Sequence, residues 1–129
     1  MRVLLDTHVL IALTKGSLAA TYPVIAAGLA RGDVLAWASV ASLWEIAIKT
    51  RLGKLNPGMG LADLASFFET IGLRLLSIDR MHVVADLVIE PDTRDPFDRL
   101  LLAQCQVEGL RLVTVDRALR KHPSVLASF

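Results

Sequence analysis

The sequence predicts an α/β fold in which a central parallel sheet carries helices on both faces. Short aliphatic segments alternate with segments of helical character along the chain, which is typical of consecutive strand–helix units. The aliphatic segments lack a polar–apolar alternation, as do strands that are covered on both sides. No repeat, low-complexity tract or long linker divides the 129 residues, so we expect a single domain over residues 1–129.

The expected elements of the first half are bounded by residues that suit those positions. They are, in order, a strand at 2–5, a helix at 7–14, a helix from Pro23 to Gly32, a strand at 34–38 and an amphipathic helix at 39–52. Pro23 suits the first turn of a helix, because its φ is already helical and its missing N–H would have no partner there. Gly32 and Gly53 suit helix ends, where a left-handed backbone is common.

The second half continues the same alternation. Its expected elements are a helix at 61–71, a strand at 73–78, a helix at 79–89, a helix at 96–108 and a strand at 110–115. Gly72 and Gly109 follow two of these helices and suit their ends. The segments NPGMG and EPDTRD are rich in Pro, Gly and Asp, which favours loops.

Composition limits the cellular setting. The formal net charge of +1 gives no strong field for nucleic acid and does not exclude such a partner. The only cysteine, Cys105, excludes an internal disulfide and a thiolate metal cage, and it fits a reducing cytoplasm. Asp6 and His8 interrupt the apolar N-terminal run, which argues against a signal peptide. No apolar run reaches the roughly 18 residues of a membrane span, so we expect a cytoplasmic protein without a membrane partner.

The chain is unusually apolar for a small domain. Hydrophobic residues make up 53% of it and the mean hydropathy is +0.52, whereas soluble domains contain roughly 45–50% apolar residues with glycine included. A domain of this size cannot bury all of that surface. We therefore expect another chain to cover part of it, the alternative being an ordinary surface rich in Ala and Leu.

Two acids directly follow predicted strands. Asp6 ends the run RVLLD and Asp116 ends the run RLVTVD. A carboxylate between apolar segments is costly unless it is paired, caps a helix or binds a metal. In open α/β sheets, binding sites form outside the carboxyl ends of the strands, where the strand order switches. The two acids are therefore expected to face one crevice, although 110 positions separate them.

A third acid, Glu45, lies among apolar residues of the helix predicted at 39–52. Ser42 precedes it by three positions, as in a capping box, and Lys49 follows by four, as in an ion pair. A helix that begins at Ser39 instead places Glu45 about two turns inside it. Structural and functional roles for Glu45 both remain open at this point.

A fourth acid, Asp98, lies in the segment TRDPFDRLLLAQ. Asp95 suits the N-cap of a helix and Pro96 its first position. One explanation of Asp98 is purely structural, because an acid in the first turn interacts favourably with the helix dipole. One cap suffices for a helix, however, and Asp98 leads directly into the apolar run LLLAQ. Asp98 is therefore the acid of this segment expected near the buried face.

Asp6, Glu45, Asp98 and Asp116 are set apart from the other acids by their apolar neighbours, and together they imply an acidic pocket. With no opposing lysine such a pocket would repel itself, and Mg²⁺ or Mn²⁺ would relieve the repulsion. No Cys/His spacing suggests zinc, since the three histidines are scattered. Carboxylate-held Mg²⁺ typically handles phosphate esters. Because neither a Walker loop nor GxGxxG is present, no nucleotide cofactor is expected, and the phosphate would belong to the substrate, as in a nucleic-acid backbone.

Four motifs give the chain a family resemblance. The segments LLDTHVLI, SVASLWEIAIKTRLGKL, DPFDRLLLAQ and LVTVD occur in this order over nearly the whole length. In this set the sequence resembles PIN-domain ribonucleases, and among them the VapC-like toxins of type II toxin–antitoxin systems. It departs from similar proteins, which often carry a histidine shortly before DPFDR, where this chain reads EPDTRD.

The resemblance implies a three-layer sandwich around the parallel sheet and a metal-dependent endoribonuclease that cuts single-stranded or loop RNA, such as tRNA or rRNA. Asp6 and Asp98 would be the principal ligands of Mg²⁺, or of Mn²⁺ in its place, with Glu45 and Asp116 completing a catalytic quartet. The implied partners are the RNA substrate, a cognate antitoxin and a second copy in a homodimer.

Supporting roles are expected for three further residues. By the resemblance, Asp95 would contribute to the acidic site, and Thr114 would orient a carboxylate through its hydroxyl. Arg99, together with Arg94, flanks the third acid and could position phosphates. A second basic group, Lys49, Arg51 and Lys54, has either this role or that of a solvated helix face.

Three other functions compete with this one. A phosphohydrolase of a non-RNA substrate, of the haloacid-dehalogenase-like kind, would need DxD after the first strand, where this chain has Asp6-Thr7-His8. A receiver domain would need paired acids at the first strand and a lysine after the last, where Arg117 stands. A non-enzymatic α/β interaction module would use all the acids as caps.

Overall fold

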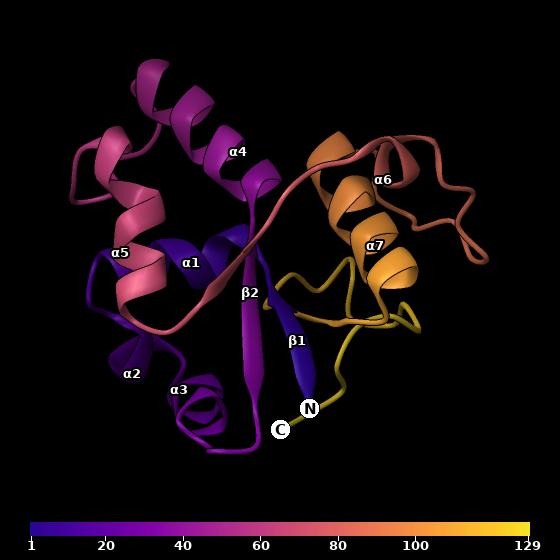
Figure 1. The fold of residues 1–129 in the computed structure, drawn as a ribbon, viewed down its shortest axis with the longest axis horizontal. Helices are drawn as coiled ribbons and strands as arrows, with labels where there is room; N and C mark the ends of the chain where they lie inside the picture. Colours follow the sequence, from indigo (N-terminus) through magenta and orange to yellow (C-terminus); the bar gives the residue numbers. More distant parts are fainter.

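Four parallel strands form the centre of the computed structural model, which describes all 129 residues (Figure 1). They are β1 (Arg2–Leu5), β2 (Leu35–Ser39), β3 (Arg74–Leu76) and β4 (Arg111–Val113), in the order β3-β2-β1-β4. In the register, Leu5 lies beside Ala38 of β2 and Val113 of β4. The chain thus adds β2 and β3 on one side of β1 and then crosses to add β4 on the other. The strand order switches between β1 and β4, and this switch point is where α/β sheets form their sites.

Helices cover both faces of the sheet, as the sequence predicts. They are α1 (Thr7–Thr14), α2 (Leu18–Thr21), α3 (Pro23–Leu29), α4 (Val40–Arg51), a 3₁₀ turn at Leu61–Asp63, α5 (Leu64–Thr70), α6 (Arg80–Val84) and α7 (Pro96–Glu108). In Figure 1, α1, α2, α3 and α5 lie on one side of the strands, and α6 and α7 lie on the other. None of the helices combines the length and the apolarity that a membrane span requires.

The alternation of side chains along β1 divides the core into two layers. Val3 and Leu5 point to one face and pack with Phe68 of α5, whereas Leu4 points to the other and packs with Leu102 of α7. All five side chains are fully buried. The structure is therefore a three-layer sandwich with a central parallel sheet, which confirms the predicted fold class.

The helix expected at 79–89 is much shorter in the structure. It begins with a capping box between Asp79 and His82 and ends at Val84, because Ala85 is extended, with φ −60° and ψ 131°. The apolar residues that suggested a longer helix do not form a buried stripe, since Val88 is 87% exposed. The prediction for residues 85–89 was therefore wrong.

Smaller differences occur at other helix ends. The helix that starts at Pro23 ends at Leu29, so Gly32 does not close it, and Gly32 has no left-handed backbone. The short helix α2 was not expected. Gly109 does end α7 in the left-handed region, with φ 67°, as its position predicted.

Candidate metal-binding active site

Asp6 lies at the carboxyl end of the central strand β1, next to the switch point. It is 2% exposed, and its side chain forms no capping hydrogen bond with α1, which begins at the next residue. Instead Asp6 Oδ2 accepts a hydrogen bond from the hydroxyl of Thr114, which follows β4. Burial raises the pKa of Asp6 above its usual value, and the Thr114 hydrogen bond opposes the increase. The structure thus confines a carboxylate where its ionised form needs a positive partner.

Thr114 also connects Asp6 to Asp116. The Thr114 hydroxyl accepts a hydrogen bond of 3.0 Å from the backbone N–H of Asp116 while it donates to Asp6. Asp116 Oδ1 accepts from the backbone N–H of Ala118 at 2.9 Å, which fixes the turn after β4. The hydroxyl of Thr114 therefore orients a carboxylate, as the resemblance led us to expect, and that carboxylate is Asp6.

Glu45 is 5% exposed and lies in the second turn of α4. Ser39 is the N-cap of this helix, so the alternative of a capping box between Ser42 and Glu45 is wrong. Glu45 Oε1 accepts a hydrogen bond of 2.8 Å from the Thr7 hydroxyl, which lies 2.9 Å from the hydroxyl of Ser42. Glu45 Oε2 lies 2.5 Å from Lys49 Nζ, so the ion pair considered for these two residues does form.

Asp98 lies in the first turn of α7. Asp95 is the N-cap and accepts a hydrogen bond of 2.8 Å from the N–H of Phe97, which leaves Asp98 free of that task. Its Oδ2 accepts a hydrogen bond of 3.2 Å from the Thr93 hydroxyl. Burial, followed by the charges of Asp95 and Asp6, raises the pKa of Asp98 to about 6.

The structure brings all four acids together at one end of the sheet. The negative charges of Asp6 and Asp116 both contribute to the raised pKa of Asp98, and that of Glu45 contributes to the raised pKa of Asp6. The helices that carry Glu45 and Asp98 also touch near the site, where Trp44 and Phe97 meet edge to face with ring centroids 5.6 Å apart. Four segments from separate parts of the chain therefore direct carboxylates into one region.

One cation does oppose this cluster, contrary to the expectation from the sequence. The hydrogen bond with Glu45 raises the pKa of Lys49, burial opposes the increase, and the charges of Asp95 and Asp98 add to it. A single ammonium group among five carboxylates leaves a large excess of negative charge. The donor set, which consists of oxygens only, fits a hard divalent cation such as Mg²⁺ or Mn²⁺.

The remaining predicted residues have other main contacts. Arg99 donates to Glu90 Oε1 at 2.9 Å and to the carbonyl oxygen of Ala85 at 3.2 Å, so its guanidinium is engaged outside the acid cluster. Asp95 uses one oxygen as a helix cap. The exposed His8 approaches Asp6 to 4.0 Å between Nδ1 and Oδ1.

Sequence reasoning missed three hydroxyl residues that hold the acids. Thr7 donates to Glu45 and lies beside the hydroxyl of Ser42, and Thr93 donates to Asp98. The only signal in the sequence is their position next to helix starts, where Ser and Thr are common for capping alone. The contact of Thr7 with Glu45 depends on the tertiary packing of α1 against α4, whereas Thr93 lies only five positions before Asp98.

A second group with metal-ligand chemistry lies elsewhere, at α6. His82 is 1% exposed, its Nε2 lies 2.9 Å from Glu108 Oε1, and its Nδ1 accepts the backbone N–H of Asp79 at 3.0 Å. Both ring nitrogens of His82 are therefore engaged, one in capping α6 and the other in a contact with α7. The packing of α6 on α7 explains why these three side chains lie close together.

Comparison with known proteins agrees with the fold and the motifs. The PIN-domain family, described as "PIN domain", matches residues 3–124, a range that contains all four acids. Among solved structures, the chain resembles the crystal structure of VapBC2 from Rickettsia felis bound to a DNA fragment from their promoter. The TM-score is 0.61 at 15% sequence identity, over 98% of this chain and 96% of that one. No curated protein matches the sequence. The VapBC2 structure shares the fold of this chain. Because the family model matches nearly the whole length, the chain belongs to the PIN-domain family.

Proposed function

We propose that the protein is a divalent-metal-dependent endoribonuclease, the toxin of a type II toxin–antitoxin pair, whose active site is formed by Asp6, Glu45, Asp98 and Asp116. The observation that carries the proposal is the convergence of these four carboxylates, with the pKa of Asp98 raised to about 6 partly by its acidic neighbours. Caps alone do not explain this arrangement, because Ser39 and Asp95 already cap α4 and α7. The family match supports a nuclease function.

Asp6 and Asp98 are the proposed principal ligands of Mg²⁺, with Mn²⁺ able to replace it. When bound, such a cation polarises a phosphate oxygen and makes water a stronger nucleophile at neutral pH. The chain itself keeps the ligands in place, because Thr114 donates to Asp6 and Thr93 donates to Asp98. This support from neighbouring hydroxyls reduces the freedom of both carboxylates before the substrate arrives.

Glu45 and Asp116 have a complementary role in the proposal. Thr7 and Lys49 hold the two oxygens of Glu45 in place, so this side chain is positioned to accept a hydrogen bond from water. Asp116 donates its backbone N–H to the Thr114 hydroxyl, and its side-chain Oδ1 accepts the backbone N–H of Ala118. Both acids would orient the attacking water towards the phosphodiester bond of single-stranded or loop RNA.

The partner proposal rests on exposed apolar side chains. They include Trp44 on α4, which is 57% exposed, and Val84 and Val88 in and after α6, which are 72% and 87% exposed. Surfaces of this kind are usually covered by another protein. We propose a cognate antitoxin and a second copy of this chain as the proteins that cover them, in the cytoplasm. The structurally similar VapBC2 protein, which crystallised on a promoter DNA fragment, supports the antitoxin.

The test is a cleavage assay of the purified protein on total tRNA, with Mg²⁺, with Mn²⁺ and with EDTA. Metal-dependent cutting that is lost in Asp6→Asn and Asp98→Asn, while both variants stay folded, is the expected result. Asp33→Asn and Glu69→Gln are matched controls, because both acids are exposed and distant from the cluster. Cutting that persists in EDTA or in Asp98→Asn would contradict the proposal. If tRNA is not cut, ribosomal RNA is tested with the same variants before the assay is judged.

A further inference from the structure

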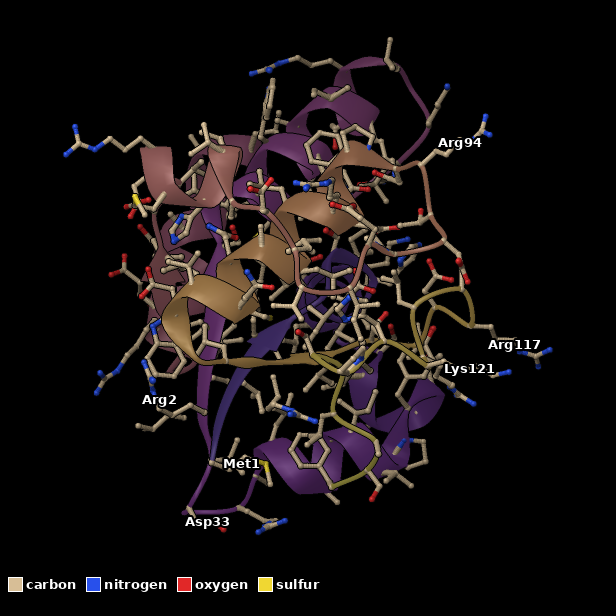
Figure 2. All side chains as sticks on the ribbon, turned by 90° about the vertical axis from the view of Figure 1, so that its right-hand side faces the viewer. Met1, Arg2, Asp33, Arg94, Arg117 and Lys121 are labelled. Atoms are coloured by element: carbon tan, nitrogen blue, oxygen red, sulfur yellow. The ribbon has the colours of Figure 1, made fainter.

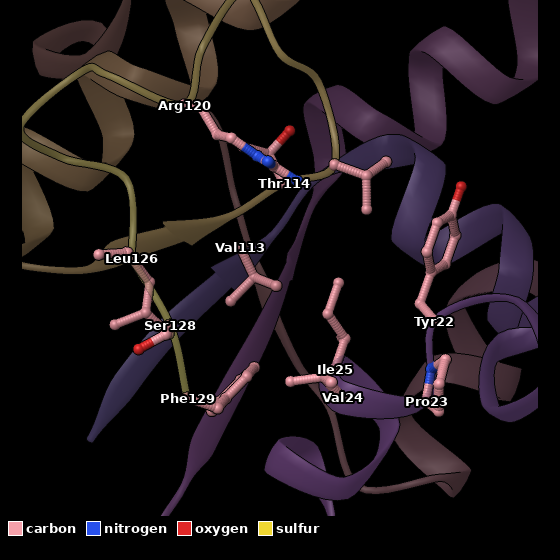
Figure 3. A pocket seen from close by; sticks show the side chains of 12 residues that line it. Tyr22, Pro23, Val24, Ile25, Val113, Thr114, Arg120, Leu126, Ser128 and Phe129 are labelled. Carbon is pink, nitrogen blue, oxygen red and sulfur yellow. The ribbon is translucent and has the colours of Figure 1, made fainter.

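A cavity of about 410 Å³ lies between the start of α3, the end of β4 and the C-terminal segment (Figure 3). Most of its wall is apolar, with Ile25, Val113 and Leu126 among the lining residues. Tyr22 stands on the side opposite Val113 and Leu126 and presents its ring to the space between them. The volume is in the range of cavities that bind small organic groups.

The cavity shares a residue with the acid cluster. Thr114 lines it and also donates the hydrogen bond that orients Asp6. Arg120 lies at the same end of the cavity as Thr114, whereas Val24 and Phe129 lie at the other end (Figure 3). The end of the cavity beside the acid cluster therefore carries a hydroxyl and a guanidinium group, and the opposite end is mainly apolar, with Ser128 as its polar residue.

Basic side chains also stand at the polar end, beside the acid cluster. Arg120 is exposed and takes part in none of the ion pairs of the protein. Arg117 and Lys121 project from the same turn, on the side of the molecule where Arg94 also projects (Figure 2). No Asp or Glu side chain lines the cavity. An anionic group would thus be attracted to the rim of a pocket whose interior suits a flat apolar group.

We propose that this cavity is a nucleotide subsite, in which one nucleobase of single-stranded RNA packs against Tyr22 and its phosphate binds Arg120, next to the scissile phosphate. Proteins commonly recognise single-stranded RNA by splaying out bases and packing them on aromatic side chains. The inference rests on the proposed ribonuclease function and adds to it the groups that hold the substrate beside the cut. An inhibitory antitoxin segment in the same cavity is the competing occupant, and the polar end with a free guanidinium favours a nucleotide over an apolar peptide.

The experiment measures the affinity of a short labelled single-stranded RNA by fluorescence anisotropy in Mg²⁺, in the cleavage-deficient Asp98→Asn background. Tyr22→Leu keeps an apolar side chain of similar reach without the ring, and the Kd is expected to rise about tenfold. Arg120→Gln is expected to raise the Kd by a similar factor and to lower the slope of log Kd against log salt by about one. Arg80→Gln, an exposed arginine of α6 on the other side of the sheet, is the matched control with no expected effect.

Binding of RNA that lacks a single base shows whether Tyr22 contacts one nucleobase or whether Tyr22→Leu only weakens the protein's fold. The RNA is resynthesised with one abasic nucleotide at each position in turn. We expect one position beside the cut at which loss of the base weakens binding to the Asp98→Asn protein about tenfold but leaves binding to the same protein carrying Tyr22→Leu unchanged. Thermal unfolding of each variant verifies that the fold is intact, and Arg120→Gln, at an exposed position, serves as the test if Tyr22→Leu does not fold.

Three outcomes would overturn the inference. If every abasic position has the same effect with and without Tyr22→Leu, and Arg120→Gln matches Arg80→Gln, the cavity does not hold a nucleotide, while metal-dependent cutting by the wild-type protein leaves the proposed function intact. If the two cavity variants bind RNA normally but are no longer inhibited by the cognate antitoxin, the occupant is the antitoxin. If the wild-type protein neither binds nor cuts RNA, the proposed function fails, and the subsite fails with it.

Discussion

Replacement of Asp98 by asparagine is predicted to stabilise the metal-free protein at neutral pH. Burial and the neighbouring acids raise the pKa of Asp98 from 3.8 to about 6. The folded protein therefore holds this proton more tightly than the unfolded chain does. The contribution of Asp98 to the free energy of unfolding is fully present below pH 4 and is lost as the pH rises towards 6. Asparagine has the same shape and never ionises, so it avoids this loss.

The size of the effect follows from the shift. A shift of about two units corresponds to about 3 kcal/mol for a fully buried group. Asp98 is only half-buried and water screens its charge, so we expect about 1–2 kcal/mol at pH 7.5 and no difference at pH 4.

Urea unfolding in EDTA at both pH values measures the difference directly. Added Mg²⁺ at one hundred times its Kd should reverse the order, because it stabilises the wild-type protein by about 2.7 kcal/mol and the variant much less. Asp33→Asn is a control for which we expect the opposite effect, a loss of stability at pH 7.5. The hydrogen bond from Arg31 lowers the pKa of Asp33, so the folded protein favours its ionised form. The reasoning would be refuted if Asp98→Asn were less stable than the wild-type protein in EDTA at pH 7.5. It would also be refuted if Mg²⁺ stabilised the variant as much as it stabilises the wild-type protein.

Three further predictions concern the same structure. Thr114→Val removes the hydrogen bond to Asp6, so the affinity for Mg²⁺ measured by isothermal titration calorimetry should fall about tenfold. Gly28→Ala would place a methyl group 2.1 Å from Phe129 Cγ, so the ring must leave α3, at a cost of about 1–2 kcal/mol in thermal unfolding. The affinity for Mg²⁺ should fall about tenfold per pH unit below about 6, because protonation of Asp98 competes with the metal.

Each has an outcome that would contradict it. Unchanged Mg²⁺ affinity in Thr114→Val would mean that the hydroxyl does not orient Asp6 for a metal. The double variant Gly28→Ala with Phe129→Ala should be no less stable than Phe129→Ala alone, and additive losses would exclude the steric cause. A flat Mg²⁺ affinity between pH 5 and 7 would show that Asp98 is not a ligand.

Short-range rules explain which parts of the fold could be read from the sequence. The helix start at Asp95-Pro96 and the N-cap Ser39 depend on side chains within two residues of the backbone groups they satisfy. The four strands were found for a similar reason, since each is a short aliphatic run that must be buried. These signals are local, and the structure confirms them.

Features that depend on distant contacts were beyond such rules. The hydrogen bond from Thr7 to Glu45 spans 38 positions, and no residue near Thr7 in the sequence predicts it. Lys49 fitted both an RNA contact and an ion pair, and only its 2.5 Å distance to Glu45 distinguishes them. The helix predicted at 79–89 extended beyond Val84, whereas the packing of the whole domain leaves Val88 exposed.

The position of β1 has a consequence for how the protein is made. This strand is synthesised before the other three, yet it lies inside the sheet and needs β4, more than 100 positions later in the sequence, to complete its pairing. Asp116 follows β4, so the last of the four carboxylates joins the other three only after β4 has been synthesised. A nascent chain that lacks β4 therefore cannot assemble the complete acid cluster.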